Sequence, residues 1–216
     1  MATLLPLLVV AFAVLAAVSM ARHREPARRA LALRRAGSGW MVAFGVLGGL
    51  FIGGETFSDP GGFAAAGMVL GWLVPLIVMA ALAWWRPRLA EPLLMVLVVV
   101  VIAYCVWSAV GSHGVGGLRD QRAPYAAVGV FVVSVALGFL GLHRPRAAGL
   151  MLLATSLLPV VVEVVGSGAP LRHAFSGSLG AASLPGLVTA GLFLLAHHES
   201  TRRRVTTRGP LPAPPR

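Results

Sequence analysis

The chain has 216 residues, of which 57% are hydrophobic and only 12% are charged. Soluble domains carry charge on about 25% of their residues, so this composition excludes an ordinary soluble domain and indicates a multi-pass membrane protein. The formal net charge is +11, and all 18 basic residues are arginine. They lie in short runs between apolar segments, as membrane topology requires, without interleaved aromatic residues on which bases could stack. We therefore expect no nucleic-acid partner.

Seven apolar segments follow one another, and each is near the ~20 residues needed to cross a bilayer. They are residues 2–20, 40–57, 63–85, 93–110, 125–143, 147–166 and 177–197. Lipid offers no partner to exposed backbone amides, so each segment should be helical. The predicted fold is all-α: a seven-helix transmembrane bundle over residues 1–198, followed by a basic, proline-rich, disordered tail over 199–216.

The first segment differs from a cleaved signal peptide, because no basic residue precedes its apolar run. The arginine-rich stretch "ARHREPARRALALRR" follows it instead, so we expect a permanent helix. With an outside N-terminus, 15 of the 18 arginines fall on the inner side. The positive-inside rule then predicts an outside N-terminus and a cytoplasmic C-terminus in the cell (plasma) membrane. The absence of lysine, with much Ala, Gly, Val and Pro, favours a bacterial source of high G+C content.

Two stretches resemble each other: "WRPRLAEPLLMVL" at Trp85–Leu97 and "HRPRAAGLMLLAT" at His143–Thr155. One reading is a parallel repeat of helix hairpins, an arrangement seen in transporters. The other reading is that R-P-R is simply a compact cytoplasmic stop.

Glycines are spaced by four in the second segment, at Gly45, Gly49 and Gly53. The third segment carries a Gly67–Gly71 pair with the same spacing. Because a short connection makes these segments antiparallel neighbours, we expect the glycines to let the two backbones approach closely.

The stretch between these segments ends in two carboxylates. Asp59 opens the turn "DPGG", where its side chain bonds the backbone ahead and Pro60 presets the turn. Glu55 has no such explanation, and it is either a solvated interfacial residue or part of a candidate outer mouth with His113 and His173. The spacings of His, Cys, Asp and Glu match no metal motif, and no metal is expected.

Glu163 is the deeper anomaly, because an ionisable residue within a span costs roughly 3 kcal/mol. Thr155, Pro159 and Glu163 share one helix face, with Ser156 beside them. Pro159 removes the donor for the Thr155 carbonyl. The candidate partner stripe on the fourth segment is Tyr104, Ser108 and Ser112. Three interpretations of Glu163 stay open. It is a structural hydrogen-bond partner between helices, it lines a polar cavity, or it lies closer to the membrane surface than the predicted bounds of its helix imply.

Motif searches find no nucleophile elbow, phosphate loop, zinc-protease motif or dinucleotide fingerprint, and retinal would need a lysine. We therefore expect no cofactor and a non-enzymatic accessory, assembly or sensory subunit with a membrane-protein partner. The alternative is a small-solute or proton-coupled transporter that uses Glu163, and an intramembrane enzyme comes third. Arg202, Arg203 and Arg204 in the tail could bind anionic lipid.

Overall fold

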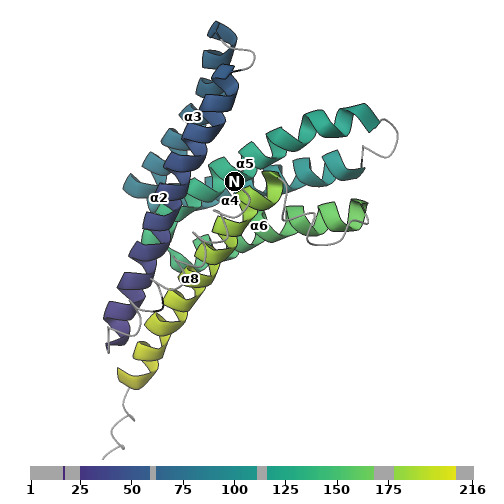
Figure 1. Ribbon diagram of the computed structural model, residues 1–216. Coiled ribbons are helices and arrows are strands. Elements are labelled where there is room, and N and C mark those ends of the chain that lie inside the picture. The colour runs from purple at the N-terminus through teal and green to yellow at the C-terminus, as the bar shows by residue number, and fades with distance from the viewer. Residues whose placement is uncertain (1–16, 18–24, 59–61, 111–115, 168–177, 208–216) are drawn as a thin grey trace, which may run out of the picture.

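The computed structural model describes residue 17 and residues 25–58, 62–110, 116–167 and 178–207. These residues form helices and short connections only, which confirms the all-helical fold (Figure 1). The helices are α2 (Pro26–Ser58), α3 (Gly62–Trp85), α4 (Pro87–Val110), α5 (Gly116–His143), α6 (Pro145–Ser167) and α8 (Ser178–Thr207). The predicted segment 2–20 lies outside the described residues apart from Ala17.

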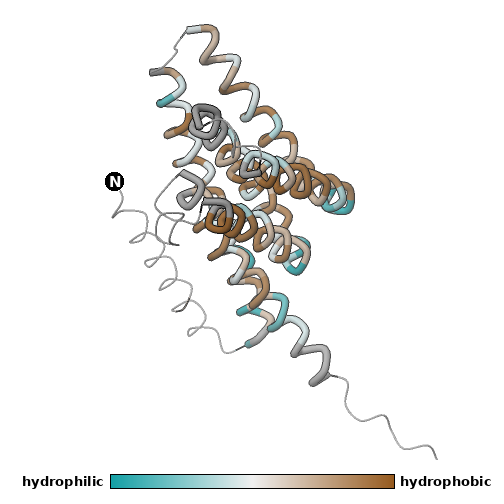
Figure 2. Tube along the Cα trace, turned by 90° about the vertical axis from the view of Figure 1, so that its right-hand side faces the viewer, coloured by the Kyte–Doolittle hydropathy of each residue, from teal (hydrophilic) through white to brown (hydrophobic). Residues whose placement is uncertain are grey.

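Five of the described helices, α2 to α6, are long and apolar enough to cross a membrane. Hydrophobic residues run along their length, while hydrophilic residues collect at several helix ends (Figure 2). These properties are those of a membrane protein. Helix α8 packs into the same bundle but is not among the five in the described part.

The connections at the two R-P-R stretches are shorter than predicted. Arg86 alone joins α3 to α4, and Arg144 alone joins α5 to α6. The stretches between the predicted segments, residues 86–92 and 144–146, are therefore mostly helical. A proline follows each arginine, and proline at the first position of a helix costs no hydrogen bond because that N–H would be unpaired anyway. The residue before a proline is also disfavoured in the α conformation, which separates the two helices.

The two corners share two backbone hydrogen bonds. The Arg86 N–H donates to the Leu82 carbonyl (2.8 Å), and the Arg144 N–H donates to the Leu140 carbonyl (2.8 Å). In the other direction, the Arg86 and Arg144 carbonyls each accept from the N–H four residues on, both at 3.0 Å. Each arginine therefore ends one helix and caps the next.

Helices α2 and α8 are longer than predicted, with 33 and 30 residues. At 1.5 Å per residue, α2 is about 50 Å long, well beyond the ~30 Å hydrocarbon core. The predicted loop 21–39 is thus helical from Pro26, and residues 199–207 of the predicted disordered tail are helical. The extensions are stabilised by packing: Leu33 of α2 forms a buried cluster with Leu192 and Ala196 of α8.

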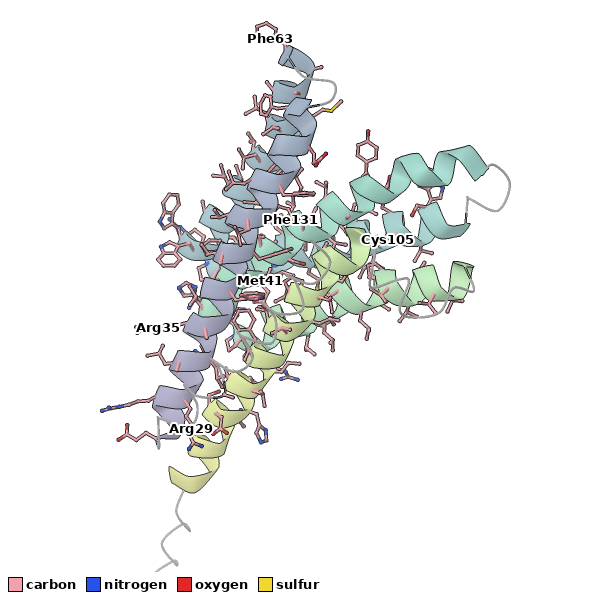
Figure 3. The ribbon with its side chains drawn as sticks, in the orientation of Figure 1. Arg29, Arg35, Met41, Phe63, Cys105 and Phe131 are labelled. Carbon is pink, nitrogen blue, oxygen red and sulfur yellow. The ribbon has the colours of Figure 1, made fainter. Side chains whose placement is uncertain are left out.

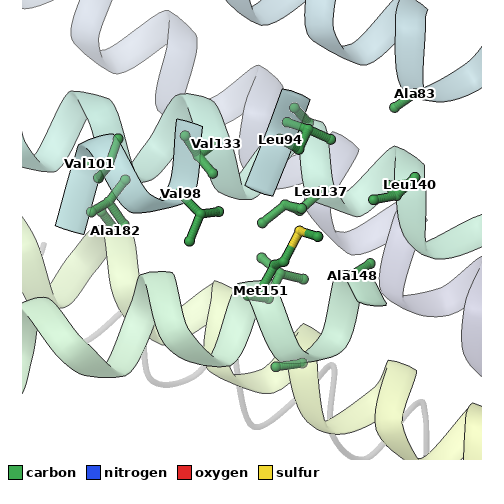
Figure 4. Close-up of a cluster of buried hydrophobic side chains, with 14 of the residues drawn as sticks. Ala83, Leu94, Val98, Val101, Val133, Leu137, Leu140, Ala148, Met151 and Ala182 are labelled. Carbon is green, nitrogen blue, oxygen red and sulfur yellow. The ribbon is translucent and has the colours of Figure 1, made fainter. Parts of the chain in front are cut away.

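Helix α5 lies at the centre of the bundle and contacts each of the other described helices. Its Val133 and Leu137 belong to a buried cluster with Leu94 and Val98 of α4 and Met151 of α6 (Figure 4). In Figure 1, the α2–α3 hairpin and the α4–α6 group extend in different directions from this centre.

The predicted glycine contact between α2 and α3 is wrong. A Cβ added at Gly53, Gly67 or Gly71 would meet nothing within 4 Å. Within the predicted set, Gly49 alone faces α3, where its added Cβ would lie 3.4 Å from the Trp72 ring. The α2–α3 contact is consequently made through a large aromatic side chain rather than through facing glycines.

The close approaches of α2 are instead to α5 and α8. A Cβ at Gly48 would lie 2.6 Å from the Phe131 ring of α5, and a Cβ at Gly37 would lie 2.8 Å from the Phe193 ring of α8. The opposite edge of the Phe193 ring would overlap a Cβ at Gly141 of α5. Phe193 is fully buried, so its ring is held between two glycines where three helices meet.

Candidate functional site

Two of the predicted site residues, Thr155 and Ser156 of α6, are fully buried. They differ in their hydrogen bonds. The Thr155 hydroxyl donates to the Met151 carbonyl of its own helix (2.8 Å). The Ser156 hydroxyl lies directly over Gly186 of α8, where an added Cβ would overlap it.

Ser156 is one of three buried serines on three helices that contact one another. Ser134 comes from α5 and Ser183 from α8, and all three are fully buried. The Ser134 hydroxyl lies 3.5 Å from the position of a Gly186 Cβ, next to the Ser156 hydroxyl. Ser183 lies one helical turn before Gly186 on α8. We call Ser134, Ser156 and Ser183 the hydroxyl cluster.

None of the three hydroxyls has a hydrogen-bond partner within the part of the chain that the structure describes. The other serines and threonines with described side chains all have a hydrogen-bond partner. Each donates to a backbone carbonyl: Ser38, Thr56, Ser108, Thr155, Thr189, Ser200 and Thr201. Because an unpaired buried hydroxyl costs about 1–3 kcal/mol, three in one place require an explanation.

Both helices that face each other at the cluster are interrupted by proline. Pro159 of α6 and Pro185 of α8 lie inside their helices and are buried. A proline has no N–H, so the carbonyl four residues earlier, that of Thr155 in α6, loses its helical donor. The Thr189 hydroxyl donates to the Pro185 carbonyl (2.8 Å). The Thr155 carbonyl, which lacks its helical donor, is therefore next in the sequence to Ser156, whose hydroxyl lacks an acceptor in the described part of the chain.

The predicted partner stripe on α4 does not join this site in the described part of the molecule. The Ser108 hydroxyl donates to the Cys105 carbonyl of its own helix (2.8 Å). Tyr104 is half-buried, packs against the apolar core and has its ring centroid 6.0 Å from that of Trp107. Among the described residues, no hydrogen bond links Tyr104 or Ser108 to Thr155 or Ser156. The polar side of α6 faces α5 and α8 instead.

Ser134 and Ser183 are not among the residues predicted from the sequence. Ser134 lies in the apolar run "FVVSVALG", where nothing marks it as different from a small packing residue. Ser183 did carry a signal, because "SLPG" at 183–186 combines a hydroxyl, a helix break and a glycine. The proline-interrupted stretch of α6 shows the same combination of hydroxyl and helix break.

Among the remaining predicted residues, the structure describes the side chain of Glu55 alone. Helix α6 includes Glu163 in its backbone, but the Glu163 side chain lies outside what the structure describes. Glu55 is exposed near the end of α2. His113, His173, Ser112 and the turn residue Asp59 fall outside the described residues. In the described part, no group of three His, Cys, Asp or Glu side chains could hold a metal ion.

Basic residues gather at the opposite ends of the helices from Glu55. Glu91, in the first turns of α4, forms an ion pair with Arg144 of the other R-P-R corner. The His143 ring lies edge-on to Trp84 of α3, with centroids 6.3 Å apart. The two corners are therefore neighbours, and both belong to one arginine-rich end of the bundle.

Comparisons with protein-family models, curated proteins and solved structures matched no family, protein or structure to this chain.

Proposed function

We propose that the chain is a seven-helix protein of the cell membrane, with the N-terminus outside and the C-terminus in the cytoplasm. The neighbouring R-P-R corners support this threading, because Arg86 and Arg144 lie at one end of the bundle as the positive-inside rule requires. The matching backbone bonds at the two corners also support a parallel repeat of helix hairpins.

Reporter fusions test the threading. A cytoplasmic reporter should be active when fused after Arg216 and inactive when fused before Met1, and a periplasmic reporter should give the reverse. A fusion at the exposed Phe63, at the start of α3, should behave like the N-terminal one. An active cytoplasmic reporter at the N-terminus would contradict the orientation.

The function we propose is that of a non-enzymatic accessory, assembly or sensory subunit. The observation that carries it is the pair of helix extensions, residues 26–36 of α2 and 194–207 of α8. Phe193 contacts both Gly37 and Gly141, and α5 ends at His143. The two extensions therefore continue past the end of α5, and Figure 1 shows them projecting together from the bundle. We call them the juxtamembrane pair.

The juxtamembrane pair carries exposed charge on a fixed scaffold. Arg28 and Arg35 are exposed on α2, and Figure 3 shows Arg29 and Arg35 along the projecting part of that helix. The sequence adds Arg202–Arg204 on α8. Such a basic surface suits the anionic lipid of the inner leaflet or an acidic face of a membrane-protein partner.

A photocrosslinking amino acid at Leu31, exposed on the juxtamembrane pair, tests this role. We expect a discrete protein crosslink in cells from Leu31 and none from Leu70, which is exposed on the apolar surface of α3. Crosslinks to lipid alone at both positions would contradict a protein partner. Replacing Arg28 and Arg35 with glutamine should weaken the crosslink if charge guides docking.

A second candidate, a small-solute or proton-coupled transporter, is favoured by the hydroxyl cluster, since transporters bind their substrates between interrupted helices. The Glu163→Gln and Glu163→Leu variants test it. If Glu163 carries a proton, the glutamine variant should accumulate and fold normally but lose activity in a host phenotype. A fully functional glutamine variant would remove Glu163 from the candidate site.

A further inference from the structure

We propose that the hydroxyl cluster is an internal binding site for a small uncharged hydrogen-bonding molecule, with water as its occupant. The proposal concerns the inside of the bundle and is independent of the juxtamembrane pair. It starts from Ser134, Ser156 and Ser183, which are fully buried and lack partners in the described part of the chain.

The first argument is that this chain satisfies its hydroxyls elsewhere. Thr155 and Thr189 are just as buried and lie on the same two helices, yet each donates to a carbonyl of its own helix at 2.8 Å. A serine inside a helix has the same carbonyl within reach. None of the three serines uses that carbonyl. We explain this by a common hydrogen-bond partner between the three helices.

The second argument is geometric. The Ser134 and Ser156 hydroxyls lie near the same point, the Cβ position of Gly186, although they come from different helices and do not bond each other. Glycine at 186 leaves the Ser156 hydroxyl in place, because any side chain there would displace it. A molecule that bonds both hydroxyls therefore links α5 to α6 beside Gly186 of α8.

The third argument concerns which molecule fits. Each serine hydroxyl has one proton to donate and lone pairs to accept, so the occupant has to do both, as water does. A cation would use only the lone pairs, and it would leave three donors without acceptors. Pro159 and Pro185 also free the carbonyls of Thr155 and Ala181, which are one and two residues from Ser156 and Ser183 in the sequence. Facing helices with such breaks are a known setting for small-molecule sites.

Thermal unfolding of the purified full-length protein in lipid nanodiscs tests the proposal. Ser134→Ala and Ser156→Ala should each lower Tm by about 2–4 °C, the shift expected for the loss of one ordinary hydrogen bond in a chain of this size. The double variant should lose less than the sum, because either change already releases the shared molecule. Gly186→Ala should act like Ser156→Ala, since it pushes that hydroxyl out of the site.

The matched control is Thr189→Val, whose hydroxyl is buried but bonded within its own helix. It should show no coupling to Ser134→Ala. If the serine-to-alanine changes raise Tm, the hydroxyls are unsatisfied and the cluster holds nothing. Strict additivity would show that the serines do not share a partner. Both results would overturn the proposal.

A second measurement detects the water itself. Cysteine at position 156, introduced as Ser156→Cys, should exchange its thiol proton in D2O much faster than Cys105, which is buried among apolar side chains. Infrared spectra of the S–H band, with Cys105→Ala to assign it, separate the two thiols. Equal, slow exchange would argue against water at the site. Stabilisation by sodium chloride but not by choline chloride would show a cation instead.

Discussion

The stretches of α3 and α5 that are apolar enough to cross a membrane, Gly62–Trp85 and Tyr125–His143, have the same mean hydropathy, but they occupy opposite positions in the bundle. Only 6% of the apolar stretch of α3 is buried within the molecule, compared with 72% for α5. The buried residues of α3 are Ala65 and Ala83, whereas those of α5 include Val130, Val133 and Leu137. Phe63 at the start of α3 is 99% exposed.

The comparison shows that hydropathy selects a helix for the membrane but does not place it within the bundle. Lipid tails are as apolar as leucine, so burial against another helix gains little from the hydrophobic effect and depends on close packing. Both helices contain glycines, but only those of α5 meet a neighbour: Gly138 meets Met41 and Gly141 meets Phe193. Helix α5 therefore differs from α3 in that a side chain of a neighbouring helix packs against Gly138 and Gly141.

The largest expected effect is from truncating a buried leucine of α5. Leu137→Ala should destabilise the protein by about 2–5 kcal/mol, because it opens a cavity in the central cluster. Leu70→Ala in α3 removes the same atoms from a side chain that is 56% exposed and should change stability by less than ~0.5 kcal/mol. Unfolding by denaturant in mixed micelles measures both. Equal losses would mean that α3 is buried against a partner.

Replacing a glycine in each helix tests the same difference between α5 and α3, with a smaller expected change in stability. Gly141→Ala should cost about 1–3 kcal/mol, because the buried Phe193 ring also abuts Gly37 and cannot move aside. Gly71→Ala in α3, which faces open space, should be neutral or slightly stabilising. Phe193→Leu in the Gly141→Ala background should restore part of the loss. If Phe193→Leu restores no stability, the added methyl group of Gly141→Ala clashes with a residue other than Phe193.

The smallest effect is expected at the corners where α3 and α5 end. Glu91→Gln removes the ion pair with Arg144. The Glu91 side chain is 26% exposed and the Arg144 side chain is 41% exposed. It should therefore cost only about 0–1 kcal/mol and less in high salt. In the second corner, Gly149 stands where Glu91 stands in the first, and it lets α8 approach closely. A loss that salt does not change would point to packing rather than charge at this pair.

Parts of the candidate site could be predicted, and parts could not. Ser156 was identified because a hydroxyl beside Pro159 breaks an otherwise apolar helix. The spacing by four at Tyr104 and Ser108 predicts that its partners lie on α4, whereas its described neighbours lie on α5 and α8. Spacing shows which residues share a face, but it does not show which helix that face meets. Ser134 could not have been found for the same reason.

The sequence by itself determined the helical class, the membrane character and the presence of a helix break at each of the two R-P-R stretches. Each depends on local chemistry: apolar length, the lack of a proline N–H, and the cost of unpaired amides in lipid. Only the tertiary structure decided that α5 is central and α3 peripheral, that α2 and α8 continue as a pair, and that buried serines of α5 and α6 meet at Gly186 of α8. These outcomes depend on contacts between residues up to a hundred or more positions apart, such as Ser38 with Gly138. Between helices of equal hydropathy, the shapes of the facing side chains determine these contacts.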